Sequence, residues 1–505
     1  MADLVRIHLV PLGESFEVDR GTPLDTVLFR YGVEFPCGGA GQCRGCRVKV
    51  LDGAIEITPE MEEIFTPPEL AEGWRLACRA RADASLTLEI AQWETPILSD
   101  ERKLVFEPAE GLGIAIDIGS TTLVAQLVDL ETAEVLAVET ALNPQIEHGA
   151  DIMTRVEFAL AGRENAARLA ELIRRQTGEM CAALMGHTRA IRNRVTEVLL
   201  AGNSVMHHLF SSIDVEPLAH VPFDLADGGM KRFDVADLDW PLSDKPSVTF
   251  LPCLGSFVGS DILAGILATG MAGSDHLDVL VDLGTNGEIV VGNRDGMLCA
   301  STAAGPAFEA GRIRMGMRAA TGAIAHVSAV DGNFHCKVLG DGEPRGLCGS
   351  GLVDAVAVAL DLGSILPTGR LAGDQKSLPL AGQVTLVQRD IRELQLAKAA
   401  IAAGLRILLE QSGVSEADIR TVYLAGAFGN YVNVASALRI GLLDVDRHKI
   451  KPSGNTALAG TKLVLLNRSR RAEFLEEIPT RVRHVGLASD PRFQDIFTDC
   501  LAFGA

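Results

Sequence analysis

The chain has 505 residues, of which 47% are hydrophobic and 22% charged, so it is long enough for several domains with sizeable cores. Its formal net charge of −20 argues against nucleic acid and anionic membranes as partners. The first residues lack a basic stretch followed by an apolar run, so we expect no signal peptide and a cytoplasmic protein.

The first ninety residues have the pattern of a small mixed sheet. Residues 4–10 and 15–19 predict two strands joined by a turn, and Thr22-Pro23 predict the start of a helix that runs to about Tyr31. Further short strands are expected at 48–51 and 86–90. The pattern therefore predicts a sheet crossed by one helix.

Four cysteines in this region have the spacing of an iron–sulfur site. Cys37, Cys43 and Cys46 lie close together among glycines, and Cys78 follows further along the chain. A 2Fe–2S cluster needs four thiolates, and a glycine-rich loop can supply three of them. Glycine also lets backbone N–H groups approach the sulfurs. We expect these four residues to hold a 2Fe–2S cluster, and the other six cysteines to be small buried residues.

The region resembles the β-grasp ferredoxin family over about ninety residues, and the gap of five residues after Cys37 matches its adrenodoxin-like branch. We assign residues 1–92 to this domain. Residues 93–109 contain Trp93, Pro96 and Pro108 without clear periodicity, and we interpret them as a linker. A linker would let the ferredoxin domain move while it stays concentrated near the rest of the chain.

Residues 110–505 alternate apolar strands with helical segments, as α/β proteins do. One motif occurs twice, at 114–122 and 279–287: an aliphatic strand, then aspartate, an aliphatic residue, glycine and hydroxyl or amide residues. The repeat predicts two similar lobes, at roughly 110–275 and 276–505, that face each other.

The repeated motif indicates a nucleotide site. The carboxylates of Asp117 and Asp282 would hold Mg²⁺ through water, while the following residues bind phosphate. Glu288 would position the water that attacks ATP, or else cap a following helix. The expected catalytic residues are Asp117, Asp282 and Glu288, and the expected phosphate-binding residues are Gly119, Ser120, Thr121, Thr122, Gly284, Thr285, Asn286 and Gly287.

Two more glycine segments and one arginine are candidates for the same site. Residues 422–430 predict a strand, a glycine turn and a helix, in which Gly426, Ala427 and Phe428 would lie against adenine. Gly349 and Ser350 lie in a glycine turn that opens a helix, where they would form a hinge or contact phosphate. Arg155 would contact phosphate or another subunit, or form a salt bridge on a helix.

These motifs resemble the superfamily of two-lobed ATPases that includes acetate kinase, sugar kinases, chaperones and actin. Asp117 matches its first phosphate motif, Asp282 the second and Gly426 the adenosine motif, although Ala427 stands where many members have a second glycine. The resemblance implies an α/β multidomain fold: a β-grasp 2Fe–2S ferredoxin domain, then a two-lobed actin-like, ribonuclease H-like ATPase fold.

The combination of the two domains resembles the reductive activators of corrinoid-dependent enzymes. The segments that fit this family are 143–145, 149–155, 201–208, 282–288 and 390–398. The resemblance implies ATP-dependent, one-electron reduction of Co(II) to Co(I) in a corrinoid protein. No dinucleotide-binding motif is visible, so we expect an external reductase to supply the electron. Two-lobed ATPases often pair, so a homodimer is also considered.

Three other functions fit parts of the sequence. The first is an ATP-switched binding clamp whose cluster senses redox state. The second is a low-potential electron donor to a non-corrinoid enzyme, as in dehydratase activators, although suitably paired cysteines are missing after residue 110. The third is a sugar or acid kinase with an appended ferredoxin, which the segments that fit the activator family argue against.

Overall fold

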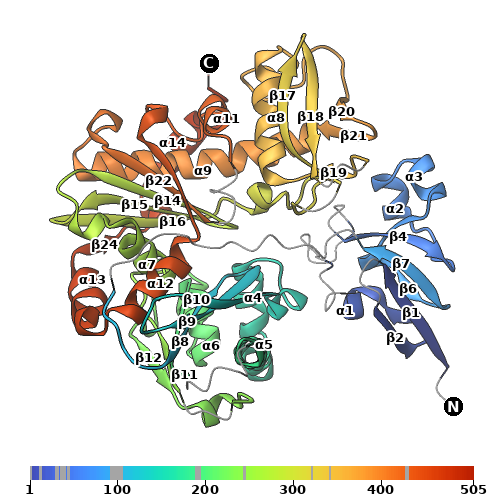
Figure 1. Cartoon of the computed structure of the whole chain (residues 1–505). Coiled ribbons are helices and arrows are strands. Elements are labelled where there is room, and N and C mark those ends of the chain that lie inside the picture. Colours follow the sequence, from blue (N-terminus) through green and yellow to red (C-terminus); the bar gives the residue numbers. More distant parts are fainter. Residues whose placement is uncertain are drawn as a thin grey trace.

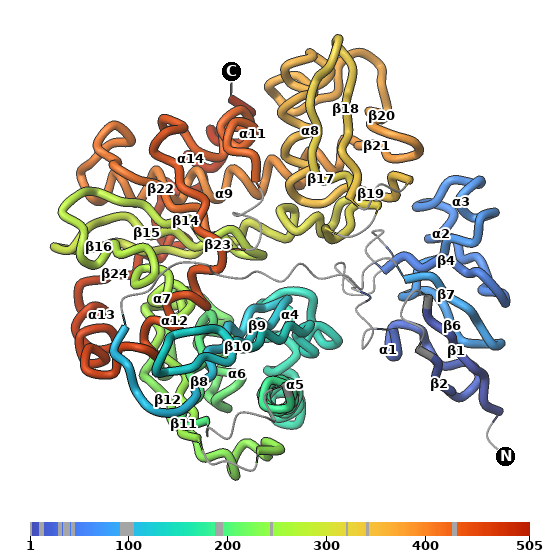
Figure 2. Tube along the Cα trace, in the orientation of Figure 1, coloured from blue at the N-terminus to red at the C-terminus, as the bar shows by residue number. Residues whose placement is uncertain are grey.

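The computed structural model describes residues 3–10, 14–28, 33, 41, 46–90, 106–187, 195–242, 246–319, 322–339, 343–426 and 432–504. Figures 1 and 2 show a small N-terminal domain, coloured blue, beside a larger two-lobed part. We call the described residues up to 90 the head, and those from 106 onward the body. Within these ranges, no helix has both the length and the apolar character needed to cross a bilayer.

The head contains the predicted mixed sheet, with strand order β2-β1-β7-β4-β5. β1 pairs antiparallel with β2 and parallel with β7, and β4 pairs antiparallel with both β7 and β5. The elements are β1 (Leu4–Val10), β2 (Glu14–Asp19), β3 (Thr22–Pro23), α1 (Leu24–Leu28), β4 (Arg47–Asp52), α2 (Pro59–Ile64), α3 (Pro67–Ala71), β5 (Trp74–Leu76), the 3-10 helix η2 (Ala77–Arg79), β6 (Arg81–Ala82) and β7 (Leu86–Ile90).

The predicted start of the first helix was wrong. Thr22 and Pro23 form strand β3, which pairs antiparallel with Arg81 and Ala82 of β6. The helix begins at Leu24 instead. The strand partner lies about sixty residues away, so its pairing competes with the local helix-start signal in a way that a short sequence window does not contain.

The first lobe is a six-stranded sheet with strand order β10-β9-β8-β11-β13-β12. Helices α4, α5 and α6 pack on one face, where they share a buried core with the sheet. The elements are β8 (Leu112–Ile118), β9 (Thr122–Asp129), β10 (Val135–Leu142), the 3-10 helix η3 (Pro144–Glu147), α4 (Ile152–Leu160), α5 (Arg163–His187), β11 (Val195–Gly202), α6 (Ser204–Ser211), β12 (Lys231–Phe233), β13 (Ser247–Phe250) and α7 (Ser260–Thr269).

The second lobe has its own six-stranded sheet, with order β23-β22-β14-β15-β16-β24, and an outer part built on β17 to β21. The long helix α9 packs on this sheet. The elements are β14 (Asp278–Leu283), β15 (Gly287–Asn293), β16 (Gly296–Thr302), β17 (Ala323–Val330), β18 (Asn333–Val338), β19 (Gly346–Leu347), α8 (Gly349–Asp361), β20 (Ser377–Ala381), β21 (Val384–Val387), α9 (Gln388–Ser412), β22 (Thr421–Ala425), α11 (Val434–Arg439), β23 (Ile450–Gly454), α12 (Thr456–Leu466), α13 (Ile478–Thr480), β24 (Val482–His484) and α14 (Phe493–Asp499).

The internal repeat of the sequence is also a repeat of topology. β8 forms an antiparallel hairpin with β9 and pairs in parallel with β11, and β14 does the same with β15 and β22. Even the register agrees, because Asp117 pairs with Ala201 and Asp282 pairs with Ala425. The two-lobed arrangement predicted from the repeat is therefore present.

Helices α7 and α12 lie between the two sheets and join the lobes. One buried core contains Ala115 of the first sheet, Leu280 of the second, and Leu458 of α12. The two helices touch through their backbones, because a Cβ on Gly460 would lie 1.9 Å from the Ala264 carbonyl oxygen. The sheets are thus held on opposite sides of a shared, close-packed layer.

Candidate functional site

The two copies of the repeat place their aspartates at corresponding positions. Asp117 lies one residue before the end of β8, and Asp282 lies one residue before the end of β14. After each aspartate the backbone turns sharply. A Cβ on Gly119 would lie 2.4 Å from the carbonyl oxygen three residues further on, and Gly284 N donates to the Asn286 carbonyl at 3.1 Å. Both aspartates are therefore followed by a tight turn, and phosphate binding by these turns stays a prediction.

Glu309, at the end of the 3-10 helix η7 (Pro306–Glu309), connects the two turns. Its carboxylate accepts hydrogen bonds from Thr121 Oγ1 at 3.4 Å and from Thr285 Oγ1 at 2.9 Å. The predicted phosphate-binding hydroxyls of the two lobes thus face one another across one small space. Burial raises the pKa of Glu309. No motif in the sequence points to Glu309, which occupies hydroxyls that a phosphate would also use.

Four carboxylates gather beside the turns. Asp117, Asp261 and Asp282 are half-buried, and Glu288 is buried. Burial raises the pKa of Asp117 to about 6. Burial, together with the nearby charge of Asp117, raises the pKa of Asp282 to about 7. Burial and the charge of Asp282 raise the pKa of Asp261 to about 8. Burial and the charge of Asp261 also raise the pKa of Glu288.

This cluster has the donor chemistry of a cation site. Carboxylates that share a poorly hydrated space repel one another unless they bind protons or a cation. Carboxylate oxygens are the ligands that a hard divalent cation prefers. Within the described ranges, no three acidic, histidine or cysteine side chains converge closely enough to ligate a metal directly. The four carboxylates supply oxygen donors of the kind that Mg²⁺ prefers, and binding of Mg²⁺ stays a prediction.

The first turn is held in place by three polar side chains. Asn143 Nδ2 donates to the Gly119 carbonyl at 2.9 Å, and the fully buried Arg155 donates from Nη2 to the Ser120 carbonyl at 2.6 Å. Asn455 Nδ2 donates to Asp117 Oδ2 at 2.7 Å. Arg155 therefore supports the backbone of the first turn, and its contact with phosphate, with another subunit or in a salt bridge stays a prediction. Burial lowers its pKa to about 10.

Asn455 is a site residue that the sequence could have suggested. Its Oδ1 accepts a hydrogen bond from Leu458 N at 2.8 Å and caps the start of α12. An asparagine directly before a run of good helix formers is a recognisable N-cap signal. That signal predicts the helix start, but it does not reveal that the same side chain reaches Asp117.

The second turn is packed against the end of β22. Gly426 has a φ of +83°, and a Cβ there would lie 2.6 Å from Asp282 Oδ1. The glycine predicted for the adenosine motif thus lies directly beside the second aspartate. Glu288 lies in strand β15, where Ser301 Oγ donates to it at 3.3 Å, so its alternative role as a helix cap was wrong. Ala427 and Phe428 lie outside the described residues.

The other predicted glycine turn opens a helix as expected. Gly349 is the first residue of α8, and Ser350 Oγ donates to the Ala325 carbonyl of β17 at 2.9 Å. In this structure the hydroxyl of Ser350 therefore joins α8 to the outer part of the second lobe. A phosphate contact of Gly349 and Ser350 stays a prediction.

Two of the four predicted cluster cysteines lie in the described part of the head. Cys46 is buried directly before β4, and Cys78 is half-buried in η2. Ala77 N donates to the Cys46 carbonyl at 3.0 Å, so the two cysteine segments are bonded neighbours. A 2Fe–2S cluster needs four thiolates, and these neighbouring segments would supply two of them. Cys37 and Cys43 lie outside the described residues.

The remaining cysteines follow the expectation in part. Cys181, Cys299 and Cys348 are buried, and Cys253, Cys336 and Cys500 are half-buried.

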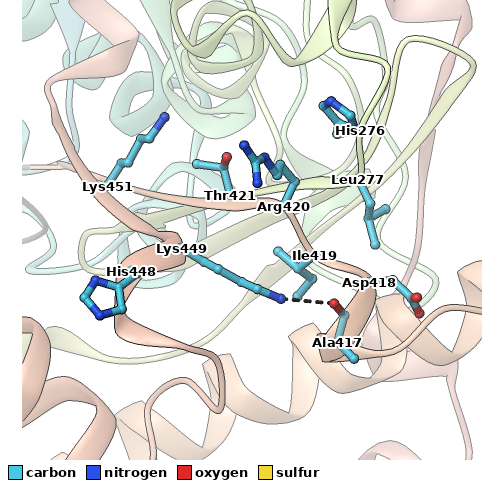
Figure 3. Close-up of a pocket in the computed structure, with 10 residues that line it drawn as sticks. All are labelled: His276, Leu277, Ala417, Asp418, Ile419, Arg420, Thr421, His448, Lys449 and Lys451. Carbon is cyan, nitrogen blue, oxygen red and sulfur yellow. Dashed lines mark hydrogen bonds between the residues drawn. The ribbon is translucent and has the colours of Figure 1, made fainter.

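A separate pocket of about 530 Å³ lies in the second lobe, at the ends of β14 and β22 that are far from Asp282 (Figure 3). Leu277 and Thr421 line it, next to the starts of β14 and β22, whereas Asp282 and Ala425 lie at the other ends of these strands. Arg420 and Lys449 also line the pocket. Lys449 Nζ donates to the Ala417 carbonyl at 3.0 Å. This pocket is therefore distinct from the site between the two turns.

Comparison with known families divides the chain into three matched parts. Residues 7–83 match the 2Fe-2S iron-sulfur cluster binding domain, residues 112–274 match the RACo middle region, and residues 276–505 match the C-terminal domain of RACo, the ASKHA domain. The match confirms the predicted fold class, a ferredoxin domain followed by an actin-like ATPase fold. It also supports binding of a 2Fe–2S cluster and of a nucleotide.

Individual proteins are similar along most of the chain. The corrinoid activation enzyme RamQ of Eubacterium limosum is 34% identical over 440 residues, which cover 81% of this chain and 74% of the relative. The Co(II) methylated amine-specific corrinoid protein reductase of Methanosarcina barkeri is 27% identical and covers 76% of each chain. The solved structure of a reductive activator for corrinoid, iron-sulfur protein has 26% identity and a TM-score of 0.71, over 99% of this chain and 98% of that one.

Proposed function

This chain belongs to the RACo family of reductive activators, and from that premise we propose that it reduces Co(II) to Co(I) in a corrinoid protein by ATP-dependent, one-electron transfer. The observation that carries the proposal is the presence of an electron-transfer domain and a two-lobed nucleotide site in one chain. Two similar proteins named for corrinoid activation and corrinoid reduction support the choice of acceptor.

The nucleotide part of the proposal rests on the two turns. Backbone N–H groups at Gly119–Thr122 and Gly284–Gly287 bind the phosphates, and Asp117 and Asp282 hold Mg²⁺ through water. Thr121 and Thr285 release Glu309 when their hydroxyls bind phosphate oxygens instead. Glu288 is the candidate for orienting the attacking water, because it is buried in the same acidic cluster.

In the electron-transfer part, Cys37, Cys43, Cys46 and Cys78 hold a 2Fe–2S cluster, and an external reductase supplies the electron. When bound, such a cluster carries single electrons, in plant-type ferredoxins at about −400 mV. For each ~59 mV by which the reduction potential of the donor lies above that of the acceptor, the equilibrium constant for electron transfer falls tenfold. ATP assists only if it binds one conformation of the protein or its complex more tightly than another. A homodimer stays a prediction.

The test mixes the reduced holoprotein with a Co(II) corrinoid protein and follows the cobalt absorption with and without ATP and Mg²⁺. We expect Co(I) to appear, faster or to a greater extent with ATP. Cys78→Ser should abolish reduction by removing a cluster ligand. Cys500→Ser, a half-buried cysteine in the body, is the matched control and should leave reduction unchanged.

Each alternative function has its own outcome. Nucleotide binding that depends on cluster oxidation, without reduction of cobalt, would favour the redox-sensing clamp. A phosphorylated small molecule would favour the kinase. Reduction that proceeds equally well with and without ATP would contradict the role of the nucleotide.

A further inference from the structure

The head contacts the second lobe through a cluster of charged and aromatic side chains. Arg345 of the body forms an ion pair with Glu89 of β7, and its guanidinium carbon lies 5.6 Å from the centre of the Trp74 ring. Arg47 of β4 lies 5.7 Å from the same ring. The indole of Trp74 therefore has one arginine from each domain near it, and each gains cation–π attraction there. Figure 1 shows β4 of the head facing β19 of the body.

This contact is close, and it lies next to the predicted cluster. Arg47 follows Cys46 in sequence, is only 1% exposed, and donates from Nη2 to Met317 Sδ of the body. A Cβ on Gly346 would lie 2.8 Å from Arg47 Nη1. The same Cβ would lie 2.6 Å from the Met315 carbonyl oxygen, so Gly346 lies between the body backbone and the guanidinium of Arg47. The chain directly after one cluster ligand is thus packed against the second lobe.

The head also contacts the first lobe, through an apolar patch. Ile146 of η3 is 6% exposed and belongs to the same buried cluster as the head's core, and Leu142 at the end of β10 packs against that cluster. Ile146 N donates to the Asn143 carbonyl at 3.2 Å. Asn143 in turn holds the first phosphate turn, as its backbone N donates to the Thr121 carbonyl at 2.8 Å. One short segment therefore connects the head's core to that turn.

The head contacts both lobes at once. If the lobes moved relative to each other, the head would have to lose its contact with one of them. In the docked arrangement Glu309 bridges Thr121 and Thr285, the hydroxyls expected to bind phosphate. We propose that the docked head is a brace that holds the lobes in this Glu309-bridged arrangement, so that ATP binding and head docking oppose each other. ATP then releases the face of the head beside Cys46 toward the acceptor. This inference rests on the proposed function.

The coupling is reciprocal, because a ligand that weakens docking must bind more tightly when docking is already weak. Arg345→Glu and Glu89→Arg each place like charges together at the docking contact. We expect each variant of the holoprotein to bind a non-hydrolysable ATP analogue about five- to tenfold more tightly than the wild type, measured by calorimetry. The double variant, with the charges exchanged, should return the affinity to the wild-type value.

The matched control is Arg439→Glu, which breaks an ion pair with Asp361 inside the second lobe. Arg439 is 27% exposed, similar to Arg345 at 30%. Its affinity for the analogue should stay at the wild-type value. A second measurement needs no variant: small-angle X-ray scattering of the wild-type protein should show a larger radius of gyration when the analogue is bound.

The outcomes separate this inference from the proposed function. Unchanged affinity in Arg345→Glu and Glu89→Arg, or failure of the double variant to restore it, overturns the brace even if cobalt is reduced normally. An unchanged radius of gyration on binding the analogue overturns it as well. A wild-type protein that binds no ATP overturns both the brace and the proposed function.

Discussion

The two copies of the repeat share their strand topology but differ in the residues that surround each turn. In the first, polar side chains hold the turn: Asn143 bonds Gly119, Arg155 bonds Ser120 and Asn455 bonds Asp117. In the second, Asp282 lies against Gly426, and its charge contributes to the raised pKa values of Asp261 and Glu288.

The two turns, although they come from a repeated motif, therefore have different contacts. The first turn is positioned by hydrogen bonds that also lead, through Asn143, to the head. The second turn places Asp282 near both Asp261 and Glu288, and carboxylates so close together favour a bound cation. We infer that the first copy couples nucleotide to the head, and that the second copy supplies most of the cation-dependent chemistry.

The largest expected effect separates the two aspartates. Asp282→Asn should lower Mg²⁺-dependent ATP hydrolysis by about 10²–10³-fold, because it removes the carboxylate whose charge acts on both Asp261 and Glu288. Asp117→Asn should cost less, about tenfold, because an asparagine oxygen still accepts the hydrogen bond from Asn455. Phosphate release measured across Mg²⁺ concentrations gives both values. Equal losses would contradict the division of roles.

A smaller effect concerns the packing behind the second turn. Gly426→Ala should lower the free energy of unfolding by about 3 kcal/mol, of which about 1 kcal/mol is the cost of positive φ and the rest the clash with Asp282. Gly413→Ala is the control, since Gly413 has a φ of +68° and open space around its Cα. It should cost only about 1 kcal/mol in urea unfolding. Similar costs for both variants would show that the site relaxes around the methyl group.

The smallest effect tests the anchoring of the first turn. Asn455→Ala and Asn433→Ala each remove a helix N-cap and should each cost about 1 kcal/mol of stability. Only Asn455 also donates to Asp117, a bond that lowers the pKa of this aspartate against the effect of burial. Without it the pKa of Asp117 rises further, so the acid limb of the ATPase pH profile should move to higher pH. Asn433→Ala should leave the profile unchanged.

Much of the candidate site was predictable because its signals are local. The glycine turns after Asp117 and Asp282, the helix that opens at Gly349 and the strand before Gly426 all follow from short runs of residue types. Asp261 and Glu309 were missed because neither lies in such a motif. Glu309 bonds Thr121 across 188 positions, and Asn455 bonds Asp117 across 338.

The sequence by itself indicated the two domain types, the repeated aspartate hairpins and the resemblance to reductive activators, and it predicted the four cluster cysteines. Only the tertiary structure decided that Glu309 joins the two turns, that four carboxylates share one site, and that the head lies across both lobes. The reason is physical. Backbone conformation depends mostly on a residue and its neighbours in sequence, whereas charge pairing, ionisation and docking depend on which distant residues exclude water together.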